Sequence, residues 1–433
     1  MTGRRRTRTT SPTPPRPRKA KLLYASALLA CASVAVGCGV IPGATGGSGD
    51  GPVKVMTWAP EKTNATNKPG MPALARAYAR WVNAHGGING RRLQVLTCND
   101  HNDSVAAAHC AERAVDEDVV AVVGSYSQHS RAFLAPLESA GIPYIGGFGV
   151  TDDEFTSPVS YPVNGGQGVL LAGLGEQLGK NCGPVSLIRP DTIAGDELPV
   201  LLDSGLKALG HSRAADQRAA EDATEYSRPT RQALEHATSD PSRPGCVVPA
   251  LGDRTNTFMD SFRRDAEDFP KVHTGTVIGN VDQSLIDATG GKSGPYEGSY
   301  VTGWYPTADD SRWNPMRAVI KEQAFGDNRI DPADAGVQTT WIAYTVLKKA
   351  IESLGAGEVS PLTLRRELDN GLKVDTGGLT PELSWRFDAD AAAADFPRLV
   401  NANVTFQAVS GGLLTSQRKG FVDMTKTLDG ETD

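Results

Sequence analysis

The 433-residue sequence lacks the motifs of several common enzyme classes. It contains no phosphate-binding loop and no Gly-x-Gly-x-x-Gly dinucleotide fingerprint, so nothing in it points to nucleotide chemistry. The stretch Gly124-Ser125-Tyr126-Ser127-Gln128 lacks the second glycine of a nucleophile elbow, and no catalytic triad is recognisable with it. We therefore expect a protein that has neither catalytic activity nor a cofactor.

Acidic residues are missing from the first 37 residues, which carry eight lysines and arginines. The remaining residues contain 36 basic and 50 acidic side chains, which gives them a net charge of about −14 at neutral pH. Proteins that bind nucleic acids need a basic surface to meet the phosphates. This charge balance argues against a nucleic-acid partner.

Long apolar runs are also scarce, and the main one lies near the N-terminus. Residues 22–37, LLYASALLACASVAVG, follow a basic, proline-rich segment. These 16 residues are short for a membrane span and suit the apolar region of a signal peptide. No other stretch is long and apolar enough to span a bilayer.

Small residues, Ala-Val-Gly, immediately precede Cys38. This arrangement resembles the lipobox of bacterial lipoproteins, in which the cysteine after the cleavage site carries lipid. Cleavage before Cys31 is an alternative that leaves only nine apolar residues, and an ordinary secretory signal or an uncleaved anchor are two others. We predict a lipoprotein signal peptide over residues 1–37 and a glycine-rich, flexible tether over residues 38–52.

Cysteine is scarce too, and four cysteines remain outside the signal peptide and the lipid site. An even number of cysteines in an exported protein indicates disulfides. We predict a Cys98–Cys110 disulfide, which closes a short loop. We also predict a Cys182–Cys246 disulfide, because each of these cysteines precedes an apolar run and neighbouring parallel strands would bring them together.

A metal site is the alternative for the first pair of cysteines. Cys98, His101, His109 and Cys110 form a Cys/His cluster. Their spacing fits no common zinc pattern, and the compartment of an exported protein is oxidising. We therefore predict no metal at this place.

The most informative stretch runs from residue 119 to residue 149. An apolar run, 119–123, is followed by a polar turn, a helical segment over 130–140 and a second apolar run over 142–145. Short runs of this kind are typical of buried parallel strands, so the stretch predicts a strand–helix–strand unit. Ligands of open parallel sheets lie beyond the carboxyl ends of the strands, where residues 125–128 and 146–150 are expected.

The same alternation of strand and helix occurs before and after this stretch, which predicts two doubly wound parallel sheets. The expected strands are residues 53–57, 93–96, 119–123, 142–145, 185–188, 217–220 (an edge strand), 247–251, 274–278, 299–305 and 403–409. The expected helices are residues 71–84, 104–115 (with Ser104 as N-cap), 130–140, 168–179, 197–209, 230–238, 256–265, 314–325 and 335–354.

Four stretches resemble signatures of the type I periplasmic binding proteins, and most closely those of branched-chain amino acid binding proteins. They are residues 81–92 (WVNAHGGINGRR), 99–103 (NDHND), 122–127 (VVGSYS) and 141–145 (GIPYI). The resemblance implies two α/β lobes joined by a three-segment hinge that close on a solute in the cleft. It places residues 53–163 and 300–372 in an N-terminal lobe, and residues 164–299 and 373–433 in a C-terminal lobe.

The resemblance also implies where the ligand contacts lie. Ser127 matches the serine of the first turn, and Gln128 stands where a second serine is usual. Phe148-Gly149-Val150 stands where Ser-Ala-Thr is common, and Asp282 corresponds to the acid that often holds the ligand's ammonium. Trp58, Tyr126 and Phe148 either contact the ligand or belong to the core. The complete set of candidate ligand-binding residues is Trp58, Ser125, Tyr126, Ser127, Gln128, Phe148, Gly149, Val150, Asp253, Asn280 and Asp282.

The resemblance and the lipobox together predict a solute-binding lipoprotein. We expect it to be held at the outer face of the cell membrane by lipidated Cys38, to capture a small polar solute such as an amino acid or a related compound, and to deliver it to the membrane subunits of an ABC importer. The alternative is a ligand-sensing lipoprotein that acts on a membrane signalling partner without transport.

Overall fold

The computed structural model describes residues 51–63, 66–192, 194–220, 223–266, 268–387 and 396–429. The predicted signal peptide, both candidate lipid-attachment cysteines, Cys31 and Cys38, and nearly all of the tether lie outside the described residues. No helix in the described ranges is both long enough and apolar enough to cross a membrane.

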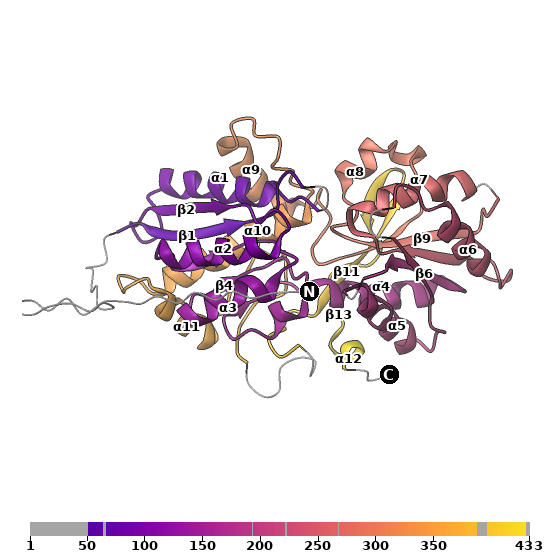
Figure 1. Cartoon of the computed structure of the whole chain (residues 1–433). Helices are drawn as coiled ribbons and strands as arrows, with labels where there is room; N and C mark the ends of the chain where they lie inside the picture. Colours follow the sequence, from indigo (N-terminus) through magenta and orange to yellow (C-terminus); the bar gives the residue numbers. More distant parts are fainter. Residues whose placement is uncertain are drawn as a thin grey trace, which may run out of the picture. The chain divides into compact units, whose positions relative to one another are not determined.

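The first lobe is built on a parallel sheet with the strand order β2-β1-β3-β4-β5 (Figure 1). Its strands are β1 (Val53–Trp58), β2 (Leu93–Cys98), β3 (Ala121–Val123), β4 (Tyr144–Ile145) and β5 (Ser160–Tyr161). Its helices are α1 (Gly70–Ala84), α2 (Ser104–Asp116), α3 (Ser130–Ala140), α9 (Asn314–Gln323), α10 (Ala335–Ser353) and α11 (Pro361–Asp369), with the 3₁₀ turns η1 (Asp152–Phe155) and η5 (Ser311–Trp313).

Both faces of this sheet are buried, because successive side chains of a strand point to opposite faces. Val55 and Val123 belong to the core that includes residues of α1 and α10. Met56 and Val122, one position away along the same strands, belong to a separate cluster with residues of α2 and α3. The continuous apolar runs of the sequence therefore become strands that are covered on both sides.

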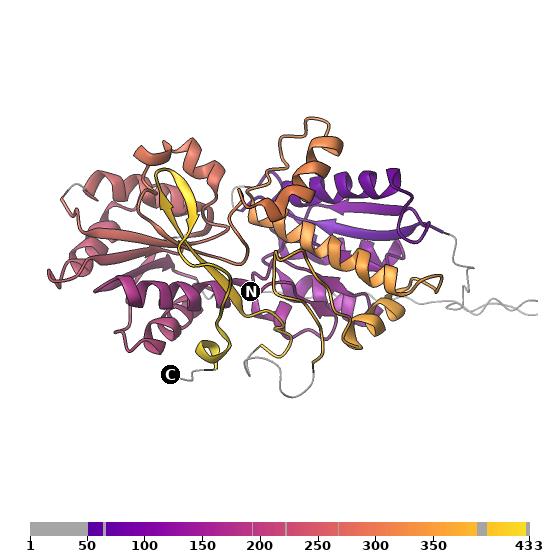
Figure 2. The same cartoon turned by 180° about the vertical axis from the view of Figure 1, so that it is seen from behind.

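The second lobe contains a larger sheet with the order β12-β11-β10-β9-β8-β6-β7, and β13 pairs with β11 (Figure 2). Its strands are β6 (Val185–Pro190), β7 (Ala215–Ala219), β8 (Gly245–Pro249), β9 (Val272–Val277), β10 (Tyr300–Gly303), β11 (Asn403–Ser410), β12 (Leu413–Ser416) and β13 (Val422–Asp423). Its helical segments are α4 (Gly166–Asn181), η2 (Ala194–Glu197), α5 (Leu198–Ala208), α6 (Ser227–Ala237), η3 (Gly252–Arg254), α7 (Thr255–Ala266), α8 (Gln283–Ala288), η4 (Gly291–Ser293) and α12 (Thr425–Leu428). The ladder is parallel from β7 to β10 and antiparallel at β11, β12 and β13.

The chain passes between the sheets after β5, after β10 and before β11, and these crossing segments bond to one another. Asn164 Nδ2 donates to Tyr305 Oη at 3.1 Å. Asn401 Nδ2 donates to the carbonyl oxygen of Val163 at 3.0 Å. The three passages therefore form one hydrogen-bonded junction between the lobes.

One strand pairing and one side-chain hydrogen bond bear on the lobe boundaries expected from the sequence, which stay a prediction. Residues 300–372 were expected in the N-terminal lobe, but β10 at the start of this range pairs with β9 in the second sheet. Residues 373–433 were expected in the C-terminal lobe, but the indole nitrogen of Trp385 donates to the carbonyl oxygen of Pro162 at 2.9 Å, just beyond β5. The antiparallel β11 rejoins the second sheet afterwards.

The sequence patterns predict the ends of most of the expected helices and strands to within a few residues. The helix expected over residues 130–140 has these same ends, and β7 is an edge strand as expected. The prediction of Ser104 as N-cap is wrong. Asp103 caps α2 by accepting from the backbone N–H groups of Val105 and Ala106, both at 2.9 Å. Both residue types are good caps, and the one whose backbone is extended takes the role.

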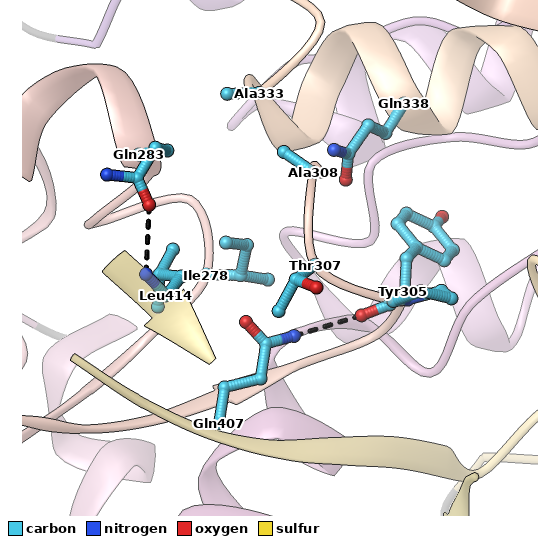
Figure 3. A pocket seen from close by; sticks show the side chains of 10 residues that line it. Ile278, Gln283, Tyr305, Thr307, Ala308, Ala333, Gln338, Gln407 and Leu414 are labelled. Carbon is cyan, nitrogen blue, oxygen red and sulfur yellow. Dashed lines mark hydrogen bonds between the residues drawn. The ribbon is translucent and has the colours of Figure 1, made fainter. Parts of the chain in front are cut away.

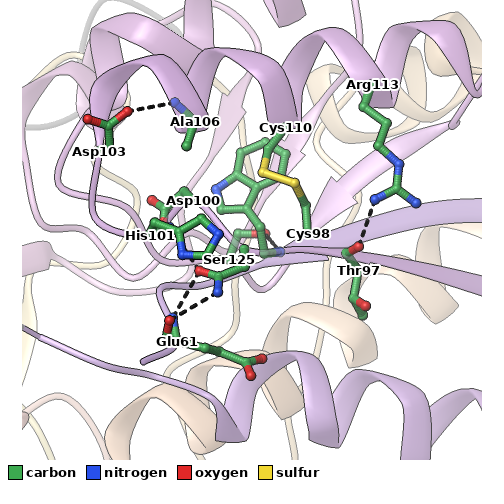
Figure 4. The surroundings of a disulfide bond; sticks show 12 residues. Glu61, Thr97, Cys98, Asp100, His101, Asp103, Ala106, Cys110, Arg113 and Ser125 are labelled. Atoms are coloured by element: carbon green, nitrogen blue, oxygen red, sulfur yellow. Dashed lines mark hydrogen bonds between the residues drawn. A yellow bond between two sulfur atoms is a disulfide. The ribbon is translucent and has the colours of Figure 1, made fainter. Parts of the chain in front are cut away.

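Both predicted disulfides are present. Cys98 at the end of β2 is bonded to Cys110 on α2, as Figure 4 shows, and Cys182 after α4 is bonded to Cys246 on β8. Within the described ranges, no cluster of three or more His, Cys, Asp or Glu side chains is arranged to hold a metal ion.

Candidate functional site

The turn that follows β3 lies at the carboxyl edge of the first sheet and is held by its own serines. The backbone N–H of Trp58 donates to Ser125 Oγ at 3.1 Å, and the backbone N–H of His129 donates to Ser127 Oγ at 3.2 Å. Both serines are buried. These hydroxyls therefore fix the shape of the turn.

Trp58 and Gln128, at either end of this region, differ in exposure. Trp58 is fully buried, with its ring 5.3 Å from that of Phe133 and 6.1 Å from that of Tyr144, so it belongs to the core of the first lobe. Gln128 is exposed, and its Nε2 donates to Tyr126 Oη at 3.2 Å. Of the two, only Gln128 reaches the surface of the turn.

Phe148, which follows β4, joins the two lobes. Its ring lies 5.1 Å from the ring of Tyr126 in the first lobe and 5.1 Å from that of Trp304, which follows β10. A Cβ added at Gly279, after β9, would come within 3.3 Å of the Phe148 ring. Phe148 is only 4% exposed, so its side chain fills the space between the strand ends of the two lobes.

A buried carboxylate supports the loop that carries Phe148. Glu154 Oε1 accepts from the backbone N–H of Val150 at 2.8 Å, and Oε2 accepts from that of Gly149 at 3.2 Å. Burial raises the pKa of Glu154 to about 7, and the backbone hydrogen bonds oppose this rise. Gly149 has φ +80°, and a Cβ there would lie 2.6 Å from Gly166 Cα, so this loop requires glycine at that position.

A buried ion pair lies beside the aromatic cluster. Lys68 Nζ is 3.1 Å from Asp334 Oδ2, and their side chains are 10% and 20% exposed. The same Nζ lies 5.8 Å from the centroid of the Phe148 ring, within the range of a cation–π contact. Neither Lys68 nor Glu154 was among the candidates from the sequence, where Lys68 stands in a polar loop and Glu154 is the third of three consecutive acidic residues.

The second lobe contributes the candidates that follow β8 and β9. Asp282 caps α8, and its Oδ1 accepts from the backbone N–H of Leu285 at 2.8 Å. Burial raises the pKa of Asp282, as do the nearby carboxylates of Asp334 and Asp331, whereas Lys68 lowers it. Asn280 is half-buried in the turn after β9, and Asp253 lies in η3. Asp282 is therefore electrostatically coupled to charged groups of the segment that leads into α10.

The comparisons with known proteins agree with this architecture. Residues 63–396 match the family model described as periplasmic binding protein. A search of curated proteins finds no match.

Several solved structures share the fold at low sequence identity. A possible leucine/isoleucine/valine-binding protein from Rhodopirellula baltica is 14% identical, with a TM-score of 0.68 over 87% of this chain and 98% of that one. A branched-chain amino acid ABC transporter protein from Thermus thermophilus with bound valine is 14% identical, with a TM-score of 0.66 over 86% and 97%. An ABC transporter solute-binding protein from R. palustris in complex with 4-hydroxybenzoate is 14% identical, with a TM-score of 0.68 over 86% and 97%.

Proposed function

Because the chain belongs to the periplasmic binding protein family, and is a solute-binding protein rather than an enzyme, we propose that it captures a small polar solute between its lobes and delivers it to an ABC importer. The solute class is an amino acid or a related compound. The observation that supports this most is the cluster of Tyr126, Phe148 and Trp304, in which strand-end residues of both lobes meet. A solute that enters here separates these rings, and closure around it would bury it.

The candidate contacts divide into two groups in this proposal. The turn at Ser125–Gln128 and the loop at Phe148–Val150 supply the wall from the first lobe. Asp253, Asn280 and Asp282 supply the wall from the second lobe. Trp58 is assigned to the core, because its side chain is fully buried beneath the turn.

A thermal-shift screen of the purified full chain in detergent tests solute binding. The compounds are amino acids, amides, urea, short carboxylates, benzoates and polyamines. A ligand at one hundred times its dissociation constant adds about 2.7 kcal/mol of stability. Failure of every class to shift the unfolding temperature would contradict solute capture.

Delivery to an importer is separated from sensing by an uptake assay. Cells that lack the protein should lose uptake of the solute found in the screen, and the wild-type gene should restore it. Unchanged uptake, together with binding in the screen, would favour the alternative of a ligand-sensing lipoprotein.

We also propose that Cys38 carries the lipid that holds the protein at the outer face of the cell membrane. Cells fed a clickable fatty acid should label the wild type and the Cys31→Ser variant, whereas Cys38→Ser should lose the label. If the Cys38→Ser variant keeps the fatty-acid label and the Cys31→Ser variant loses it, Cys31 carries the lipid instead of Cys38.

A further inference from the structure

A small pocket lies beside the crossing segment that follows β10, and we call it the crossover pocket (Figure 3). Its free space is about 10 Å³, which is room for one group the size of a water molecule. Its walls come from both lobes and are formed by Ile278, Gln283, Tyr305, Pro306, Thr307, Ala308, Ala333, Gln338, Gln407 and Leu414.

Gln407 on β11 presents an unpaired oxygen to this pocket. Its side chain is almost completely buried, at 2% exposed. Its Nε2 donates to the carbonyl oxygen of Tyr305 at 3.0 Å and to Thr405 Oγ1 at 2.8 Å, which fixes the orientation of the amide. Its Oε1 has no hydrogen-bond partner in the described part of the chain and points toward the pocket in Figure 3. A buried acceptor left in this state is unfavourable and calls for a donor.

The other two glutamines of the wall also donate from Nε2 to backbone carbonyl oxygens. Gln338 Nε2 donates to the carbonyl oxygen of Pro332 at 3.0 Å, and its oxygen is turned toward the crossing segment in Figure 3. Gln283 Nε2 donates to the carbonyl oxygen of Gly412 at 2.8 Å, while its Oε1 accepts from Leu414. The amide groups that face the pocket are therefore acceptors, with the Thr307 hydroxyl beside them.

Two acidic residues are next to residues of the pocket wall in the chain. Asp282 is the neighbour of Gln283 in the chain, and Asp334 is the neighbour of Ala333. Asp334 and Asp331 raise the pKa of Asp282 and Lys68 lowers it, which indicates that these charged groups lie near Asp282. Three carboxylates against one ammonium leave this region net negative, which favours a cation.

We propose that the crossover pocket binds the protonated amino group of the solute, and that the solute is therefore a small organic primary amine. A primary ammonium has three N–H donors, no acceptor and about the size of a water molecule, so it matches the oxygens of Gln407 and Gln338 and the hydroxyl of Thr307. A carboxylate at the same place would face the amide oxygens of Gln407 and Gln338, and only the Thr307 hydroxyl could donate to it, so its binding is disfavoured. Gly279 is next to Ile278 of the wall, and a Cβ added at Gly279 would lie 3.3 Å from the Phe148 ring, so the aromatic cluster lies near the pocket for the body of the solute.

This inference rests on the proposed function, and matched compounds test it separately. The full chain in detergent is titrated by calorimetry with butylamine, putrescine and norleucine, and with butanol, hexanoate and benzoate, which lack the amino group. An amine that binds while its isostere does not is the expected result. Binding of norleucine alone identifies an amino acid's ammonium, and binding of butylamine or putrescine identifies a simple amine.

The variants Gln407→Met and Gln338→Met remove one acceptor each and keep the length of the side chain. Loss of one hydrogen bond to a charged group should weaken binding of the amine roughly tenfold to a hundredfold. Gln232→Met, at an exposed glutamine of α6, is the matched control and should bind as the wild type does. Two variants on different elements keep the test valid if one of them fails to fold.

Two results would overturn the assignment while leaving solute capture intact. One is binding of hexanoate or benzoate with no binding of any amine. The other is an amine affinity that is unchanged in both Gln407→Met and Gln338→Met. If no compound binds at all, the proposed function itself fails and the assignment fails with it.

Discussion

Glu154 makes the stability of the first lobe depend on pH. Its carboxylate is buried and accepts the backbone N–H groups of Gly149 and Val150. Burial raises its pKa from an ordinary value of 4.5 to about 7. The folded protein therefore holds this proton more tightly than the unfolded chain does. The contribution of Glu154 to stability is fully present below about pH 4.5 and is lost as the pH rises through 7.

The size of the effect follows from the difference between the two pKa values. Each unit corresponds to about 1.4 kcal/mol, so the free energy of unfolding should fall by about 3 kcal/mol across this window. The Glu154→Gln variant carries a neutral side chain at every pH. Any change in its hydrogen bonding to Gly149 and Val150 is a constant offset and leaves the pH dependence of the difference untouched.

Denaturant unfolding of both proteins between pH 4 and pH 8 measures this difference. Other titrating groups contribute equally to the two proteins and cancel, so the gap between the two curves should change by about 3 kcal/mol, mostly between pH 4.5 and 7. A gap that stays constant from pH 4 to pH 8 would refute the argument, because it would mean that Glu154 has the same pKa in the folded and unfolded states.

Three further outcomes follow from the structure. The Cys182→Ala, Cys246→Ala double variant should lose about 4 kcal/mol in denaturant unfolding, because the disulfide closes a loop with a sequence separation of 64; an unchanged midpoint would contradict this. Phe148→Ala should lose about 3 kcal/mol in the same assay, because it empties a buried position between the lobes, and a loss under 1 kcal/mol would show that the ring is not packed there. Lys68→Met should lose about 2 kcal/mol in the same assay, because it leaves the partly buried Asp334 carboxylate without its ion-pair partner, and an unchanged midpoint would exclude a role of this pair in stability.

Much of the fold can be predicted from the sequence because buried parallel strands are continuous apolar runs. The runs at β3 and β8 are covered on both faces, so each is visible without knowledge of its partners. The strand β5 is only two residues, Ser160–Tyr161, and has no such run, so it was missed. Its pairing with β4 is a property of the assembled sheet.

The candidate site was predictable only in part. The turn after a strand identified Phe148, and the resemblance to the family identified Asp282; Phe148 lies where the lobes meet, and Asp334 influences the pKa of Asp282. From the sequence alone, Glu154 is expected to be an acidic side chain at the surface, but the fold buries it. Gln407 is one polar residue in a strand where polar and apolar residues alternate. The crossover pocket unites segments that lie more than a hundred residues apart in the chain, so no local pattern contains it.

The pairing of β10 with β11 has a consequence for how the protein is made. Tyr300 lies opposite Ala408, so the second sheet remains incomplete until the last tenth of the chain is available. Before that point, β10 exposes an open edge that favours aggregation. Neither lobe can be produced as one continuous fragment, and a chain released early during synthesis or export is a substrate for proteases rather than a smaller working protein. Only a nearly full-length chain can therefore form both sheets, because β11 of the second sheet lies near the C-terminus.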